Sequence, residues 1–315
     1  MWALFLPWLL GLLLIIALIA AVKRWWKTAG ALVLAVILLN VWGEVFSLGN
    51  ISGNRSNQGR DSALKVLSWN IHGGDADTLR YNAIAKRILE EDADIVFVAE
   101  CFLETTDIMD ELLRNRYPYV NYDMDKTMIY YWHHIYSKFP IIHSDAIEVE
   151  GGNEVIMSSC IDVHDKLVDI YGAHLTSNNY DEPKMGQQSV ERISGGRSLW
   201  SYMRGIETAS KQRKLETETI VDSIAVRGRC ALIVGDMNDI CGSRPLRAFK
   251  RAGFKDAWAE AGFGYGATFH APLPYRIDHM FFRQDLRLLE IKKISSKGLS
   301  DHDALIATWQ VVGVD

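Results

Sequence analysis

The first 48 residues contain two long apolar runs separated by a short basic segment. Residues 2–22 carry no charged side chain, and residues 28–48 carry only Glu44. A helix of about 20 apolar residues crosses the hydrocarbon core of a bilayer, and neither run has the polar face of a surface helix. Residues 1–48 are therefore predicted to form a two-span transmembrane hairpin that contacts the membrane through residues 2–48.

The basic segment sets the expected orientation. Lys23, Arg24 and Lys27 lie between the runs, and no basic residue precedes the first run. Because short cytoplasmic loops are enriched in Lys and Arg, this loop is expected in the cytoplasm and the rest of the chain outside it, although Arg55 and Arg60 oppose this orientation. A signal peptide is the alternative for the first run, but the missing basic start and the second run argue against it.

The remainder of the chain is expected to form a linker and one globular domain. Residues 49–61 are rich in Gly, Ser and Asn and predict a flexible linker, and residues 62–315 predict the domain. β-Strands are expected at 65–71, 94–100, 128–137, 141–149, 155–163, 167–175, 231–235, 275–283, 286–294 and 305–312. Helices are expected at 77–91, 105–115 and 208–226, with a short one after Ser243. Such a mixture suits a single layered α/β domain.

Residues 176–205 fit no single element and predict a long loop with a helical second part. The loop contains several basic residues: Lys184, Arg192, Arg197 and Arg204. These charges fit a solvated surface and a phosphate-binding surface about equally well.

Charge and cysteine content exclude some classes of protein. The net charge is −5, with five basic residues and one acidic residue in the first 60, which leaves 29 basic and 38 acidic residues in the rest. A domain of net charge −9 is unlike proteins that coat nucleic acids non-specifically. The four cysteines lack Cys-x-x-Cys spacing, which argues against a disulfide scaffold or a zinc site.

Several polar residues come directly after an apolar run, where a strand is expected to end: Asn70, Glu100, His174 and Asp236, with Asn238 two residues further on. Two further groups are Arg276-Ile277-Asp278, within an expected strand, and Ser300-Asp301-His302, just before the last strand. Strands that finish together at one edge of a sheet place such residues around a single crevice.

These residue types suit metal-assisted chemistry on a phosphate. Four of them offer oxygen ligands and no thiolate: Asn70, Glu100, Asp236 and Asp301. This donor set suits Mg²⁺ or Mn²⁺ better than zinc. His302 beside Asp278 is the arrangement that holds an imidazole as a general base, and a second histidine, His174, could steady phosphoryl oxygens. Each residue alone also has an ordinary structural explanation, such as a turn or a core histidine, so the prediction depends on the ordered set.

In this order, the motifs resemble those of the endonuclease/exonuclease/phosphatase superfamily, which has the DNase I-like fold. They are Trp69-Asn70-Ile71, Glu100 after Asp-Ile-Val-Phe-Val-Ala, His174-Leu175, Gly235-Asp236-Met237-Asn238, Arg276-Ile277-Asp278 and Ser300-Asp301-His302. The resemblance covers about residues 64–312. It implies an α/β fold, a four-layer α/β/β/α sandwich preceded here by two transmembrane helices, and Mg²⁺-dependent cleavage of phosphate esters, with Mn²⁺ as the alternative ion.

The resemblance also implies a set of metal ligands. Asn70 and Glu100 would bind the metal, with Asp301 as a further ligand. The family often has Gln just before the metal-binding Glu, whereas this chain has Ala99. That difference leaves the ligand intact and removes a contact on the substrate side.

The remaining motif residues acquire catalytic roles from the same resemblance. Asp236 and Asn238 would position water and phosphate, and Asp278 would orient His302 as the base. His174 would bind or protonate the phosphate.

The sequence leaves the substrate open. A nucleic acid, a phospholipid headgroup and a small phosphorylated metabolite all fit a phosphodiesterase or phosphatase of this kind, and no obligate protein partner is evident. The alternative is a non-catalytic, membrane-tethered binding module with the same fold. A module without activity would have little reason to retain both Asp278 and His302.

Overall fold

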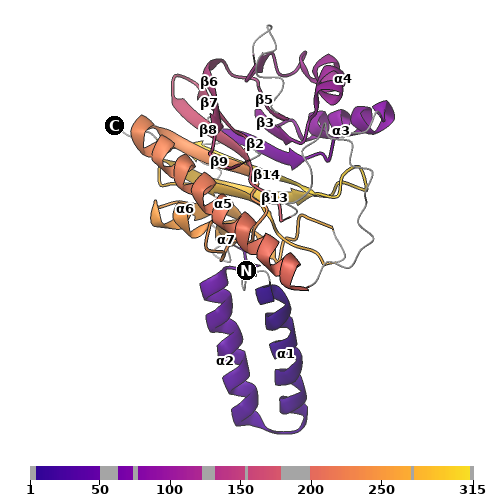
Figure 1. Ribbon diagram of the computed structural model, residues 1–315, viewed down its shortest axis with the longest axis vertical. Coiled ribbons are helices and arrows are strands. Elements are labelled where there is room, and N and C mark those ends of the chain that lie inside the picture. Colours follow the sequence, from indigo (N-terminus) through magenta and orange to yellow (C-terminus); the bar gives the residue numbers. More distant parts are fainter. Residues whose placement is uncertain are drawn as a thin grey trace.

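A helical hairpin projects from a globular body in the computed structural model (Figure 1). The structure describes residues 5–49, 63–73, 77–122, 132–152, 155–178, 199–270 and 273–312. The hairpin comprises α1 (Leu6–Val22) and α2 (Trp26–Gly43). Among the described residues, α2 is the one helix that is long and apolar enough to cross a membrane, and α1, with 17 residues, is slightly shorter.

The second helix ends earlier than the apolar run suggests, at Gly43 instead of near Leu48. Glu44 adopts a left-handed conformation with φ of 48°, and its N–H donates to the Asn40 carbonyl at 2.7 Å. The Asn40 side chain then bonds the carbonyl and the N–H of Phe46 at 3.0 and 2.8 Å, which turns the chain out of the helix. Val45, near the end of the run, is buried against the globular body, and composition alone does not separate this from burial in lipid.

Ser47–Leu48 forms β1, which pairs antiparallel with β11 (Phe263–Gly264). The expected linker, residues 49–61, lies outside the described residues apart from Gly49.

Two six-stranded sheets form the centre of the body. The order in the first sheet is β13 (Leu286–Ile294), β14 (Ala304–Val311), β2 (Ala63–Asn70), β3 (Ile95–Ala99), β5 (His133–Ser137) and β4 (Tyr119–Val120). The order in the second sheet is β10 (Lys255–Asp256), β12 (Asp278–Phe282), β9 (Cys230–Asp236), β8 (Leu167–His174), β7 (Val155–Asp162) and β6 (Ile141–Glu148). β2 and β3 are parallel, as are β8 and β9, and the other pairs are antiparallel.

The helices cover the outer faces of the two sheets. The side chains of α3 (Thr78–Glu91) and α4 (Leu103–Leu113) pack on the first sheet, and those of α5 (Leu199–Arg227) and α6 (Arg247–Arg251) pack on the second. α7 (Ala257–Ala261) contributes to the apolar core between the sheets. This arrangement confirms the predicted four-layer α/β/β/α sandwich (Figure 1).

The two sheets approach closely where Phe97 of β3 packs against β8 and β9. A Cβ atom on Gly172 of β8 would lie 2.3 Å from the Phe97 ring, so a larger residue at position 172 would displace the ring. Gly235 of β9 has φ of 134°, and a Cβ there would lie 1.9 Å from the Ala173 carbonyl oxygen. Both glycines are therefore required by close packing next to the ends of β8 and β9.

All ten expected strands are present, although residues 123–131, at the start of one of them, lie outside the described residues. Of the expected loop 176–205, residues 179–198 are also outside, including Lys184, Arg192 and Arg197. The described second part of that loop is helical and belongs to α5, as expected. The four two-residue strands and α7 were not anticipated, because segments so short have no periodicity.

Candidate active site

The two parallel strand pairs bring the polar strand ends together at one edge of both sheets. Asn70 ends β2, and Glu100 directly follows β3, with φ of 55°. In the second sheet, Asp236 lies at the centre of a row, with His174 of β8 on one side and Asp278 of β12 on the other. The register of the strands thus assembles residues that are up to 208 positions apart in the chain.

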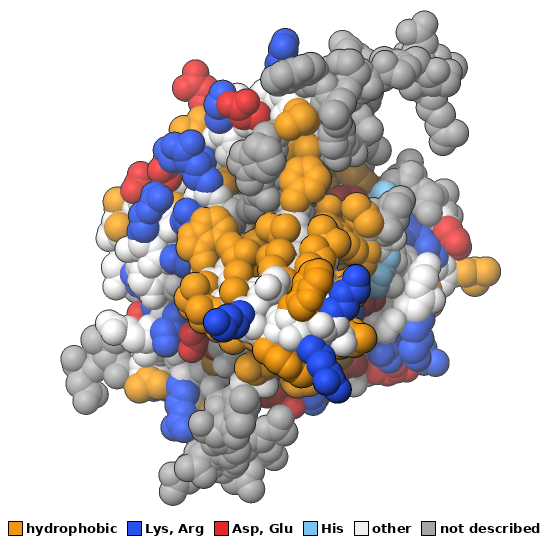
Figure 2. Space-filling model, turned by 90° about the horizontal axis from the view of Figure 1, so that it is seen from below, with side chains coloured by type: hydrophobic (Ala, Val, Ile, Leu, Met, Phe, Trp, Pro, Cys, Tyr) orange, Lys and Arg blue, Asp and Glu red, His pale blue; other side chains and the backbone are white. Residues whose placement is uncertain are grey.

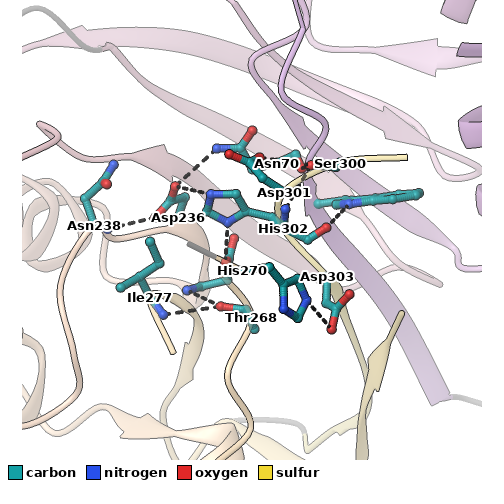
Figure 3. Close-up of polar contacts among 12 residues, drawn as sticks. Asn70, Asp236, Asn238, Thr268, His270, Ile277, Ser300, Asp301, His302 and Asp303 are labelled. Atoms are coloured by element: carbon teal, nitrogen blue, oxygen red, sulfur yellow. Dashed lines mark hydrogen bonds and ion pairs between the residues drawn. The ribbon is translucent and has the colours of Figure 1, made fainter. Parts of the chain in front are cut away.

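Asn70 connects the two sheets. Its Nδ2 donates to Glu100 Oε1 at 2.8 Å. The same Nδ2 donates to Asp236 Oδ2, in the other sheet, at 3.1 Å (Figure 3). Its Oδ1 accepts a bond from the His72 N–H at 3.0 Å, and its carbonyl accepts one from Ser300 Oγ at 2.8 Å. These contacts fix the Asn70 side chain, which is buried, between two carboxylates.

His302 and Asp278 form a buried hydrogen-bonded pair. The distance between His302 Nδ1 and Asp278 Oδ2 is 2.7 Å, and the His302 side chain is 5% exposed. The other ring nitrogen, Nε2, lies 3.6 Å from Asp236 Oδ2 (Figure 3). His302 therefore has one nitrogen held by a carboxylate and the other directed at the centre of the site. Arg276, two residues before Asp278 in the chain, pairs with Asp256 at 2.8 Å.

The backbone around this pair is held by specific bonds. Thr268 Oγ1 accepts bonds from the N–H groups of Ile277 and Asp278 at 3.2 and 3.1 Å (Figure 3). The Trp69 indole donates to the His302 carbonyl at 2.9 Å, and the Phe269 ring lies 4.9 Å from the His302 ring. The positions of both members of the pair are thus determined by side chains from distant parts of the chain.

Charge and burial shift the pKa values of two groups in the site. Burial raises the pKa of Asp236 to about 6, although the neighbouring His302 opposes this change. Burial disfavours a charged His302, but the carboxylates of Asp278 and Asp236 outweigh that effect and raise its pKa to about 10. Without a cation, His302 therefore holds a proton at neutral pH.

The remaining candidate residues surround Asn70 at the mouth of the site. His174 Nε2 lies 3.4 Å from Glu100 Oε1 and 3.7 Å from Asp236 Oδ2. His72 lies between Asp301 and Glu100. Its Nδ1 is 3.5 Å from Asp301 Oδ1 and 3.6 Å from Glu100 Oε2. Glu100 and Asp301 are partly exposed, with side chains 22% and 38% accessible, so they can meet a ligand from solvent.

Asn238 is next to the site, but its side chain is turned to a neighbouring loop. Its N–H donates to Asp236 Oδ1 at 2.8 Å, and its Nδ2 donates to the Leu175 carbonyl at 2.8 Å. The structure thus brings all eight predicted residues to the same edge of the two sheets. Asn238 contacts Asp236 through its own backbone N–H.

The donor set fits a divalent cation. Four carboxylates gather here: Glu100, Asp236, Asp278 and Asp301. Among the described residues, the ion-pair partners of these carboxylates are histidines, and no Lys or Arg neutralises them. Oxygen-rich sites with surplus negative charge are those that hard cations occupy. Asp236, Asp278 and His302 also offer three ligand atoms within 4.8 Å of one another, although the 2.7 Å bond already pairs two of them.

Some residues of the site were not singled out from the sequence. His72 directly follows the Trp69-Asn70-Ile71 motif, and its position in the chain is the one signal that could have revealed it. Thr268 and His133 carry no such signal: Thr268 lies in an irregular segment, and His133 of β5 packs its ring 5.3 Å from that of His174.

Comparison with known proteins identifies the family. The sequence model of the endonuclease/exonuclease/phosphatase family matches residues 67–302 of the chain. No curated protein is significantly similar to the chain in sequence. Among solved structures, truncated TDP2 of Caenorhabditis elegans is 18% identical, with a TM-score of 0.57 over 79% of this chain and 98% of that one.

Two other solved structures have similar scores. Sphingomyelinase C from Streptomyces griseocarneus is 15% identical, with a TM-score of 0.54 over 78% of this chain and 99% of that one. A family protein from Bacteroides thetaiotaomicron is 17% identical, with a TM-score of 0.53 over 78% of this chain and 97% of that one. At these identities the likeness concerns the fold alone. The family match, however, extends over most of the chain and includes every motif of the site, and the chain belongs to the endonuclease/exonuclease/phosphatase family.

Proposed function

We propose that the chain is a membrane-anchored, Mg²⁺-dependent hydrolase of phosphate esters. The observation that carries this proposal is the His302–Asp278 pair. Nε2 of His302 lies 3.6 Å from Asp236 and beside a group of carboxylates that lacks a Lys or Arg partner among the described residues. A base, a buried acid and a cation-binding set at one edge are the groups that hydrolysis of a phosphate ester requires.

Each group has a distinct role in the proposed reaction. Glu100, Asn70 and Asp301 would hold the cation, with Mn²⁺ as the alternative to Mg²⁺. The cation would supply positive charge that stabilises the phosphoryl oxygens and lowers the pKa values of neighbouring acids.

The proton in this reaction moves through His302. In its unprotonated form, the ring accepts the proton of the attacking water at Nε2 while the water oxygen bonds to phosphorus and the bond from phosphorus to the leaving oxygen breaks. The leaving oxygen takes a proton from solvent. Asp278 holds the ring in the required orientation and stabilises the positive charge that develops. Asp236 and Asn238 orient the water and the phosphate, and His174 donates a hydrogen bond or a proton to a phosphoryl oxygen. A nucleic acid, a phospholipid headgroup or a small phosphorylated metabolite would carry the phosphate ester.

The hairpin supports the membrane part of the proposal. Its helices expose apolar side chains along most of their length. Hydrophobic side chains gather at the centre of the face seen from below, with Lys and Arg beside them (Figure 2). We infer that α1 and α2 both cross the bilayer, with Lys23, Arg24 and Lys27 in the cytoplasm and the globular body outside it. Protease added to intact cells should then cleave near residues 49–60 and release the body. A body that stays protected until the membrane is opened would reverse this orientation.

Hydrolysis of bis-p-nitrophenyl phosphate by the full-length protein in detergent tests the catalytic proposal. His302→Ala should lower turnover by about 10²-fold or more, because a general base contributes about 10²–10⁴-fold. His143→Ala is the matched control, since the His143 side chain is 64% exposed and lies in β6, away from the site. Circular dichroism establishes that both variants are folded.

Cation binding is measured separately from activity. Glu100→Gln should weaken the binding of Mn²⁺ observed by electron paramagnetic resonance, whereas Glu148→Gln, at the end of β6, should not. A folded wild-type protein that binds no cation and hydrolyses no phosphate ester would favour the alternative function, a membrane-tethered binding module.

A further inference from the structure

The β1–β11 ribbon carries an apolar face beside the base of the hairpin. Leu48 pairs directly with Phe263, and the side chains of these two residues are among the most exposed large apolar groups of the protein, at 71% and 79%. Phe46 continues the same face, and its ring lies 5.6 Å from that of Tyr265, which packs inward against the cluster at the base of the hairpin. Ser47 lies on the opposite face, where its hydroxyl donates to the Ala259 carbonyl at 3.2 Å. One side of the ribbon is thus bonded to the body, and the other presents Phe46, Leu48 and Phe263 outward, with exposed fractions of 38%, 71% and 79%.

The hairpin is packed firmly against the same part of the body. Leu6 and Leu10 of α1 are buried in a cluster with Ile240 and Ile277 of the globular body. At the end of α2, a Cβ on Gly242 would lie 2.8 Å from the Gly43 Cα, so the two backbones are nearly in contact. The ribbon and the end of the hairpin therefore form one continuous surface.

Glu44 fastens this junction through three contacts. Its Oε1 lies 2.7 Å from Lys250 Nζ, its Oε2 accepts a bond from Cys241 Sγ at 3.1 Å, and its carbonyl accepts a bond from Arg276 Nη2 at 3.0 Å. Arg276 is buried and is itself bonded to both oxygens of Asp256, at 3.0 and 2.8 Å. These contacts, one of which reaches the buried Arg276–Asp256 pair, hold the end of the hairpin in a fixed position on the body.

A basic segment borders the ribbon and the hairpin. It comprises α6 and the loop before it and contains Arg244, Arg247, Lys250 and Arg251. The Arg247 guanidinium lies 4.2 Å from the ring centroid of Trp42, in the last turn of α2, and Arg244 and Arg251 are exposed. This density of positive charge contrasts with the net negative charge of the chain from residue 61 onward. Anionic lipid headgroups attract such segments when these lie next to a membrane span.

We propose that this hairpin-side face, made of the ribbon residues Phe46, Leu48 and Phe263 and of the basic segment, is a membrane-contact surface that takes the anionic headgroup region of the bilayer. The proposal rests on the membrane anchoring proposed above. With α2 in the bilayer, the four residues from Gly43 to Ser47 span at most about 14 Å. The headgroup region is about 5–8 Å deep, so the ribbon lies in it or directly above it.

The contact surface also fixes the candidate active site relative to the bilayer. Tyr275 packs its ring 6.3 Å from that of Trp8 in α1, and Phe269, in the segment between Tyr265 and Tyr275, packs against His302. Ile277, buried against the hairpin, directly precedes Asp278. The membrane contacts and the catalytic pair thus belong to the same packed unit.

Fluorescence quenching in vesicles tests the proposal. The full-length protein carrying Phe263→Cys, labelled with an environment-sensitive fluorophore, is reconstituted in phosphatidylcholine with and without phosphatidylglycerol, and quenching by spin-labelled lipid is measured. Val226→Cys is the matched control, because Val226 is 88% exposed and the end of α5 lies on the side of the body away from the hairpin (Figure 1). The wild-type protein, treated with the same fluorophore, measures the background that comes from the four native cysteines.

We expect quenching at position 263 to exceed that at position 226 by about twofold or more, since contact with the interface brings lipid within reach. Phosphatidylglycerol should increase the difference, and the double variant Arg244→Glu, Arg251→Glu should remove that increase. Equal, weak quenching at both positions in protein that resists alkaline extraction would overturn the contact surface and leave the anchoring intact. Extraction of the protein by alkali would overturn the anchoring and the contact surface together, while the hydrolysis assay in detergent remains an independent measure of catalysis.

Discussion

The proton on His302 is controlled by the two carboxylates that flank it. Asp278 is the stronger influence, because it is hydrogen-bonded at 2.7 Å, whereas Asp236 lies at 3.6 Å. With a folded-state pKa of about 10, above the usual 6.5, the charged ring contributes stability in full below about pH 6.5. That contribution is lost as the pH rises through the folded-state value.

Asp278→Asn should lower the pKa of His302 toward its usual value, because it removes the nearest negative charge. Histidine resonances of the selectively labelled protein, titrated in detergent without divalent cations, measure this shift. Asp145→Asn is the control, since Asp145 contacts His143 at 2.9 Å on the surface of β6 and should leave the His302 titration unchanged. An unchanged His302 pKa in Asp278→Asn would show that the pair does not control the proton.

The sequence predicted the site better than it predicted the contacts that support it. Strand-end residues such as Glu100 and Asp236 are visible because a polar group after an apolar run is unusual. Thr268 and His72 are not, because their roles depend on distant backbone groups and side chains that the fold brings together. Arg276 is an instructive case: it is adjacent to Ile277-Asp278 in the motif, yet its partner is Asp256.

Among the elements, the long strands were readily predicted and the short ones were not. Strands such as β3 and β9 are nearly continuous apolar runs, which is typical of strands that are buried on both faces. β1 and β11 have two residues each, and they exist because the base of the hairpin packs on the body. No local pattern distinguishes such pairing from a loop or from the end of a membrane span.

Close packing of β8 on β3 predicts a specific cost for a small substitution. Gly172→Ala should lower the free energy of unfolding by about 1–3 kcal/mol, because the added methyl group overlaps the Phe97 ring and overpacking costs that much. Denaturant titration of the detergent-solubilised protein measures the cost. Phe97→Leu in the same background should recover part of it, and an equal cost in both backgrounds would show that the ring is not the obstacle.

For the whole molecule, the junction at Glu44 determines where the globular body begins. A chain starting at residue 61 lacks β1, Val45 and the partner of Lys250, whereas a chain starting at Val41 retains them. The shorter chain should melt at least about 3 °C lower, because burial of one Val contributes about 1.5 kcal/mol and each 1 kcal/mol is worth about 2–4 °C in a domain of this size. Differential scanning calorimetry of the two chains makes the comparison, and equal melting temperatures would assign residues 44–48 to the hairpin alone.

The bridge that Asn70 makes between the sheets has a consequence for the order of events in folding. Its partners Glu100 and Asp236 are carried by different sheets, and the base, His302, joins only after a loop of 232 residues has closed. No fragment that lacks part of residues 70–302, and no half-formed sandwich, can therefore contain a complete site. Enzymatic activity, once measured, would serve as a reporter of fully folded protein during refolding, appearing in the last kinetic phase and never before it.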